Sequence, residues 1–143
     1  MKKGVDYTGV CIIFVCHDGK GNFLMDKRGK DSRDEQGCWE FGGGGLEFGD
    51  KVEDTIRKEV REEYGTDVLD YEFIGYRDVH RKQGKVKTHW IALDFLVKVD
   101  RLKAKNGEPR KIDEIGWFTL GNLPSPLQSQ TSVTLELLKK KLS

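Results

Sequence analysis

Three glutamates, Glu59, Glu62 and Glu63, follow a run of four glycines at positions 42–45. In a helix the spacing i, i+3, i+4 gathers such side chains at one end, where like charges repel one another. A cation held between the carboxylates would remove that repulsion, and oxygen-only ligands favour Mg²⁺, with Mn²⁺ as the alternative, over zinc. The segment therefore indicates a divalent-metal site beside a glycine-rich loop that could admit phosphate.

The glutamates need a helix to position them, and the sequence predicts one over Val52–Tyr64. Asp50 is the expected N-cap, with Glu53 three residues later completing a capping box. Gly65 is the expected stop signal, because glycine readily adopts the left-handed conformation that ends a helix.

Advancing about 100° per residue along this helix places Ile56 and Val60 on the buried face. Glu59 and Glu63 project beside that apolar stripe, and Glu62 lies on its flank. A charged helix usually presents a solvated face, but carboxylates beside an apolar stripe must be paired or bind a metal. The helical pattern therefore separates Glu59 and Glu63 from ordinary surface charge.

The glycines Gly42–Gly45 have two interpretations. Such a run commonly forms a flexible loop. A chain that turns sharply and presents backbone groups near a metal or a diphosphate also needs residues without Cβ. Because no Gly-Lys-Ser/Thr follows the run, a P-loop nucleotide hydrolase is disfavoured.

Length and composition limit the alternatives. The chain has 143 residues and a formal charge of +1, which suits one domain over residues 1–143 and argues against a nucleic acid polymer or a membrane as the main partner. Three cysteines with no metal-type spacing give no disulfide framework, and Cys11 is expected to be a buried thiol. A cytoplasmic setting follows as the default.

The hydrophobic pattern predicts a mixed α/β (α+β) fold. Strands are expected over 8–16, 23–26, 38–41, 68–79, 88–99 and 114–119, with a second helix over Thr131–Leu142. Since strict alternation of strand and helix is absent, the pattern favours a mixed sheet packed between helices over a doubly wound parallel sheet.

The stretch from Gly44 to Thr66 resembles the Nudix box, Gly-x5-Glu-x7-Arg-Glu-U-x-Glu-Glu-x-Gly-U, where U is aliphatic. Gly44, Asp50 and the run Lys58–Gly65 fall at its fixed spacings. Trp39-Glu40-Phe41 and the later Glu114–Phe118 are similar to elements that flank the box in many members.

The resemblance implies an α/β/α sandwich, with the box as a loop–helix–loop, and Mg²⁺-dependent hydrolysis of a nucleoside diphosphate linked to another moiety. A small nucleotide is then the expected partner, most closely a nucleoside triphosphate, and dimers are common in the family. In that family the glutamates matching Glu59, Glu62 and Glu63 bind the metal, often assisted by a carbonyl from the loop matching Gly43–Gly44. Glu62 is expected to act as a ligand or as the base.

The match departs from the pattern at Asp50, Lys58 and Thr66, where the family has Glu, Arg and an aliphatic residue. The first two positions form an ion pair that braces the loop in the family. The Asp–Lys combination keeps both charges. Aspartate is shorter than glutamate, however, and lysine lacks the guanidinium group that binds a carboxylate through two hydrogen bonds. Gly42 stands where many members have Pro. The substitutions at Gly42, Asp50 and Lys58 therefore all concern the loop that frames the expected metal ligands.

A further base often comes from another loop in this family. Glu114 is the candidate because it lies just before Trp117-Phe118, and Glu108 is the reserve. Glu114 could equally be a surface residue at a strand edge.

Candidate substrate groups are basic or aromatic. Arg28, with Lys30 and Arg33, could meet phosphates, although solvated loop charge is the commoner explanation. Trp39, Phe41, Trp90 or Trp117 could stack a base, and His89 could reach a pocket. Core packing is the competing explanation for the aromatic residues and the histidine.

Two other functions remain open at this point. One is a pyrophosphatase for ADP-ribose or a nucleotide sugar, since the box handles only the diphosphate. The other is a weakly catalytic module of the same fold that binds a nucleotide or a protein.

Overall fold

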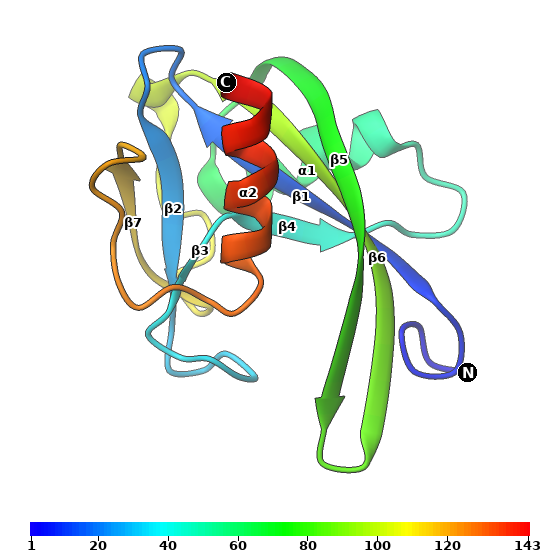
Figure 1. Cartoon of the computed structure of the whole chain (residues 1–143). Coiled ribbons are helices and arrows are strands. Elements are labelled where there is room, and N and C mark those ends of the chain that lie inside the picture. The colour runs from blue at the N-terminus through cyan, green and yellow to red at the C-terminus, as the bar shows by residue number, and fades with distance from the viewer.

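A seven-stranded mixed sheet forms the centre of the molecule in a computed structural model that describes all 143 residues (Figure 1). Its main path runs β3-β2-β1-β6-β5, while β4 pairs with β1 and β7 pairs with β2. The β1–β6 pair is parallel and the other pairs are antiparallel. The strands are β1 (Gly9–His17), β2 (Phe23–Arg28), β3 (Trp39–Glu40), β4 (Gly42–Gly45), β5 (Val68–Gln83), β6 (Val86–Val99) and β7 (Ile112–Phe118).

Two helices, α1 (Val52–Tyr64) and α2 (Thr131–Leu142), cover opposite faces of this sheet, and a short 3-10 helix spans Arg101–Lys103 (Figure 1). Alternate residues of β1 point to opposite faces. Phe14 packs with α1 in one buried core, whereas Val15 packs with α2 in the other. The predicted sandwich around a mixed sheet is therefore confirmed.

The β5–β6 ribbon is longer than the sequence predicts. The expected strand ends were Val79 and Thr88, but pairing continues to Gln83 opposite Val86, with the turn at Gly84. This end of the ribbon projects beyond the helices (Figure 1), where most side chains are exposed. No apolar alternation marks the extra residues because neither face enters a core.

Helix α1 has the predicted bounds, Val52–Tyr64, but a different N-cap residue. Lys51 is the N-cap and its side chain makes no capping hydrogen bond, so the capping box from Asp50 is wrong. The Lys51 carbonyl accepts the Thr55 N–H at 3.0 Å, whereas the Asp50 N–H donates to the Glu47 carbonyl in the preceding turn. The C-terminal prediction is confirmed, because Gly65 is left-handed at φ 65° and donates to the Arg61 carbonyl.

The glycine run forms strand β4 rather than a sharp turn, and its close approach to neighbours explains the composition. A Cβ on Gly42 would overlap the Phe14 ring, and one on Gly44 would lie 2.6 Å from the Glu59 carboxyl carbon. Gly43 and Gly44 pair with Ile13 and Ile12 of β1. The missing side chains thus let β4 lie directly against both the core and α1.

All three cysteines are free. Cys16 is fully buried, while Cys11, which the sequence predicts to be buried, is only partly so and lines a cavity. No helix combines the length and the apolar character needed to cross a membrane.

Candidate functional site

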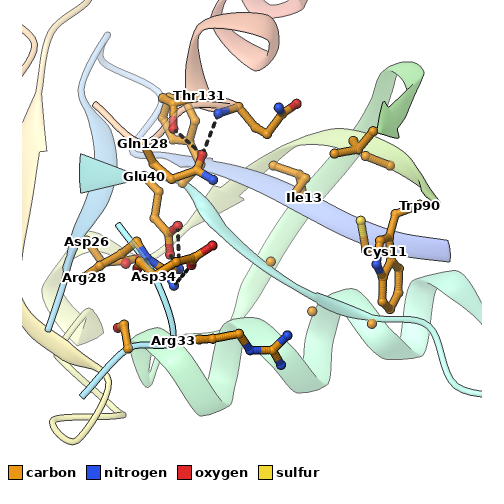
Figure 2. Close-up of a pocket in the computed structure, with 18 of the residues that line it drawn as sticks. Cys11, Ile13, Asp26, Arg28, Arg33, Asp34, Glu40, Trp90, Gln128 and Thr131 are labelled. Atoms are coloured by element: carbon orange, nitrogen blue, oxygen red, sulfur yellow. Dashed lines mark hydrogen bonds and ion pairs between the residues drawn. The ribbon is translucent and has the colours of Figure 1, made fainter. Parts of the chain in front are cut away.

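A cavity of about 730 Å³ lies where β1, β2, β4, α1 and the β5–β6 ribbon meet. Its polar lining carries both signs of charge: acidic Asp26, Asp31, Asp34, Glu40, Glu59, Glu63 and Glu108, and basic Arg28, Arg33, Arg77, Arg81 and Lys111. Figure 2 shows Arg28, Asp34 and Glu40 gathered at one end of the cavity and Cys11 with Trp90 at the other.

Glu59 and Glu63 both line this cavity, next to Gly43 and Gly44. The Gly43 N–H donates to Glu63 Oε2 at 3.2 Å, and the Glu59 carboxyl group packs under Gly44. The Glu59 side chain is only 17% exposed. The structure therefore brings together two of the predicted metal ligands and both predicted loop residues.

Glu62 is placed differently. It is exposed and does not line the cavity, and the three glutamate carboxylates do not gather within 4.8 Å of one another. Of the three glutamates expected to converge on one site, only Glu59 and Glu63 therefore do so. The helical pattern accounts for this, because it sets Glu62 on the flank of the buried stripe.

Burial changes the acidity of the two cavity glutamates. Loss of water raises the pKa of Glu63 well above its usual range, with further repulsion from Asp26 and Glu108. The pKa of Glu59 is also raised, first by burial and then by Glu62. Grouped, partly dehydrated carboxylates favour a bound dication, and their oxygen-only chemistry fits Mg²⁺.

Behind the glutamates lies a second acidic group that sequence reasoning missed. Asp26 is buried and accepts a hydrogen bond from the Tyr64 hydroxyl at 2.5 Å. It stands opposite Glu40 in the β2–β3 register. Burial and then Glu40 raise the pKa of Asp26 well above its usual range. The available signal was a charge directly after the apolar residues Phe23–Met25 in a predicted strand.

Arg28, a predicted phosphate ligand, lines the cavity but is already paired. Its guanidinium donates to Glu40 at 3.1 Å and to Asp34 at 2.9 Å (Figure 2). Arg33 also lines the cavity and forms no ion pair within 4.0 Å, whereas Lys30 is exposed outside it. Arg33 is therefore the more available cation.

The predicted stacking residues separate into two groups. Phe41 and Trp90 line the cavity. Trp39 is buried in the core beneath α2, edge-on to Phe118 at 5.1 Å between ring centroids, and does not line the cavity. Trp117 is covered by the Arg101 guanidinium outside the cavity. Packing against the second core removes Trp39 from the predicted substrate set.

His89 also lies outside the cavity. Its Nε2 is 2.7 Å from Asp78 and its Nδ1 is 3.2 Å from the Thr8 hydroxyl. Its neighbours Thr88 and Trp90 line the cavity, so strand alternation turns His89 to the opposite face. The prediction that His89 reaches the substrate is wrong for this reason.

Of the two candidate bases, the structure places the reserve at the cavity. Glu114 is exposed on β7, 3.9 Å from the Lys27 ammonium, and does not line the cavity. Glu108 lines it and contributes to the raised pKa of Glu63. Glu114 faces away because it pairs with Lys27 in the β2–β7 register.

The expected brace between Asp50 and Lys58 is not formed. Lys58 Nζ lies 4.0 Å from Glu59 Oε1, and no ion pair joins it to Asp50 within that distance. Aspartate is one methylene shorter than the glutamate of the family pattern, and Asp50 lies in an exposed turn before the helix.

One buried ion pair at the cavity wall was also missed. Arg77 lines the cavity and pairs with Asp94, which is fully buried on β6. Burial raises the pKa of Asp94 although Arg77 opposes the shift. Arg77 Nε is buried without a hydrogen-bond partner. An acid inside the apolar strand IALDFLV was the signal that could have revealed the pair.

Comparison with known proteins finds matches over most of the chain. The family model described as the NUDIX domain matches residues 7–138. The oxidized purine nucleoside triphosphate hydrolase of Danio rerio is 30% identical over 117 residues, which cover 79% of this chain and 67% of that protein. Nucleoside triphosphatase NudI of Escherichia coli is 39% identical over 49 residues, covering 34% of this chain and 35% of NudI.

Solved structures agree in fold. The MutT NUDIX hydrolase of Burkholderia pseudomallei superposes with a TM-score of 0.82 at 26% identity, covering 93% of this chain and 99% of that one. The NUDIX domain of Shewanella oneidensis NrtR, solved with ADP ribose, gives a TM-score of 0.74 at 14% identity, covering 100% and 91%.

Proposed function

The chain belongs to the Nudix family of hydrolases, which act on phosphoric anhydrides, and we propose that its substrate is a nucleoside triphosphate or a related nucleotide and its cofactor Mg²⁺. One observation carries the proposal. Glu59 and Glu63, two partly dehydrated carboxylates, meet the backbone of Gly43 and Gly44 inside a cavity that also holds an unpaired basic residue, Arg33.

Glu59 and Glu63 are the proposed principal ligands of the cation. Glu62 is the proposed outer ligand, because its charge already acts on Glu59 from the helix flank. A backbone carbonyl of Gly43 or Gly44 would complete the set of protein ligands to the cation. When bound, Mg²⁺ neutralises diphosphate oxygens and makes a bound water more acidic.

The remaining steps belong to side chains of the cavity. Glu108 is the proposed acceptor of the water's proton, since it is the cavity carboxylate outside α1 that acts on both Glu59 and Glu63. Arg33 is the proposed cation for phosphate oxygens, whereas Lys111 also lines the cavity but lies 4.0 Å from Glu108. Trp90 is the proposed apolar surface for the nucleoside, since Phe41 lines the cavity but is only 5% exposed and packs in the α2 core.

Three further observations support a small nucleotide. The cavity volume of about 730 Å³ is typical of small-molecule sites. The formal charge of +1 gives little net attraction to a nucleic acid polymer. The Danio rerio and Escherichia coli relatives are both described as acting on nucleoside triphosphates. The three free cysteines support a cytoplasmic setting.

The test is a substrate screen with Mg²⁺ that reads released phosphate and pyrophosphate. Nucleoside triphosphates, ADP-ribose and nucleotide sugars form the separate arms, and we expect the highest kcat/KM for a triphosphate. A preference for ADP-ribose would overturn the substrate class. Absence of turnover with every nucleotide would instead favour the binding module.

Variants of α1 test the ligand assignment in the same assay. We expect Glu63→Gln and Glu62→Gln to lose Mg²⁺-dependent hydrolysis while circular dichroism shows an intact fold. Glu53→Gln is the matched control, because Glu53 is exposed on the same helix and pairs only with Arg57. Near-normal turnover in both ligand variants would contradict the assignment.

A further inference from the structure

The outward face of the β5–β6 ribbon carries a compact group of Asp78, His80 and His89. Asp78 and His80 are two residues apart on β5, so they share one face. His89 stands directly opposite His80 in the register. Val79, between the two β5 residues, lines the nucleotide cavity on the other face. The group is therefore separated from the glutamate site by the thickness of the ribbon.

The three side chains lie close together, and rotation of one of the two stacked rings would let one ligand atom of each residue face a common ion. The two imidazole rings are stacked, with centroids 4.2 Å apart and an interplanar angle of 26°. His89 Nε2 is 2.7 Å from Asp78 Oδ1. One ligand atom from each residue lies within 4.8 Å of the other two. We propose that Asp78, His80 and His89 bind a transition-metal dication of the zinc class, at a site independent of the Mg²⁺ site.

The donor set determines the class of metal. Two imidazole nitrogens and one carboxylate oxygen suit Zn²⁺, Co²⁺ or Ni²⁺, whereas Mg²⁺ prefers oxygen alone. Three protein ligands leave further positions for water. Asp78 and His80 are exposed and His89 is partly so, which lets a metal enter from solvent.

Thr8 supports one of the ligands from a different part of the chain. Its hydroxyl is 3.2 Å from His89 Nδ1. Without a metal, Nε2–H donates to the Asp78 carboxylate; a bound metal would replace that proton, and Nδ1–H would then donate to the Thr8 hydroxyl. Such a partner on the second ring nitrogen is the usual way in which proteins orient a metal-binding histidine.

A metal here would stabilise the wall of the nucleotide cavity. It would tie β5 to β6, and through Thr8 to the segment before β1, at the level where Val79 and Trp90 line the cavity. Lys82 and Lys87 form the next cross-strand pair on the same face. Their ammonium groups oppose a cation, so we expect weaker binding than at a closed structural zinc site.

The experiment is a titration of the full chain with ZnCl₂ in excess Mg²⁺, followed by ¹H–¹⁵N spectra of the imidazole rings. The chain has three histidines, so each signal can be assigned with a single variant. We expect the His80 and His89 signals to shift and saturate together, while His17 on β1 stays unchanged. Reading the imidazoles directly separates this site from zinc on cysteines or glutamates.

Affinity and stability give the second readout. His80→Asn and His89→Asn should each weaken zinc binding by at least the roughly tenfold loss seen when a supporting group of a metal site is removed. Zinc should raise the unfolding temperature of the wild type and of His17→Asn, the matched control, but not that of His80→Asn.

Unshifted His80 and His89 signals, or zinc binding by His80→Asn equal to that of the wild type, would show an ordinary His89–Asp78 ion pair and overturn the proposal. Neither result bears on the function proposed above, because Mg²⁺-dependent hydrolysis is measured without zinc.

Discussion

Glu63 is the most deeply buried of the three glutamates proposed to bind the cation, and we expect its ionisation to link metal binding to pH. Burial raises its pKa well above the usual glutamate range. A metal ligand must be deprotonated, so Mg²⁺ competes with the proton on this carboxylate. We expect the Mg²⁺ affinity to fall as pH falls through the raised pKa of Glu63, by up to about tenfold per pH unit for one competing proton.

Calorimetric Mg²⁺ titrations over a series of buffers, from mildly alkaline to mildly acidic, measure this effect. Proton release on binding, read from buffers with different ionisation enthalpies, should rise in the same range. Glu63→Gln is the reference, since it removes the competing proton along with the ligand. An Mg²⁺ affinity that stays constant down to the ordinary glutamate range would contradict the link.

Glu108 and Glu114 form a matched pair for locating the base. Glu108 lines the cavity, whereas Glu114 faces Lys27 outside it. A positioned base contributes about 10²–10⁴-fold to the rate, so Glu108→Gln should lower kcat by that order. Glu114→Gln should keep near-wild-type kcat. Initial rates at saturating Mg²⁺ and nucleotide decide between them, and a loss confined to Glu114→Gln would restore the assignment made from sequence.

The failed predictions for strand residues have one physical origin. Helical periodicity fixed which α1 glutamates lie beside the apolar stripe, and Glu59 and Glu63 are found there. In a strand, the sequence shows only that successive side chains point to opposite faces of the sheet. It does not show which of the two faces lines the cavity. Trp90 lies on the cavity face and its neighbour His89 on the other. The roles of Trp39 and Glu114 likewise depend on partners that are distant in sequence, Phe118 and Lys27.

At the level of elements, strand β4 joins the core to the proposed metal ligands. Its glycines pack against different partners, so alanine at successive positions should have different effects. Gly42→Ala would press on the buried Phe14 ring, and overpacking of this kind costs about 1–3 kcal/mol of stability. Gly44→Ala would press on the flexible end of Glu59, so we expect a small stability loss with a clear drop in Mg²⁺ affinity.

Gly45→Ala is the control for this series. A Cβ there meets nothing closer than 3.7 Å, so both stability and Mg²⁺ affinity should remain close to wild type. Urea unfolding and calorimetric Mg²⁺ titration separate the two effects. Equal responses at Gly42 and Gly44 would show that β4 acts only as a packing element.

The ends of helices and strands could be predicted from the sequence where a buried core or a capping residue determines them. Gly65 ends α1 as predicted, because left-handed backbone at that point requires glycine. The β5–β6 ribbon was underestimated because its outer end contacts no core. Asp50 resembled an N-cap in type and spacing, yet Lys51 is the N-cap, because the Asp50 N–H belongs to the preceding turn from Glu47. Such local competition between turn and cap is not encoded in residue type alone.

At the scale of the whole molecule, the site depends on the sheet being held from both sides. Tyr64 packs in the α1 core, and its hydroxyl donates a hydrogen bond to Asp26 at the cavity. Thr131 and Thr134 of α2 line the cavity from the opposite face of the sheet. Because both cores share β1, we expect them to unfold in one cooperative transition.

Leu138 and Leu142 test this dependence with the same substitution on one helix. Leu138 is fully buried in the α2 core, and Leu→Ala at such a position costs about 2–5 kcal/mol. Leu142, one turn later, is 52% exposed and should lose no more than about 0.5 kcal/mol. Urea unfolding should be followed in parallel by circular dichroism and by fluorescence of the tryptophans. A single coincident transition at lower urea for Leu138→Ala is expected. Separate transitions for the two probes would show that α2 unfolds independently of the half of the molecule that carries Glu59 and Glu63.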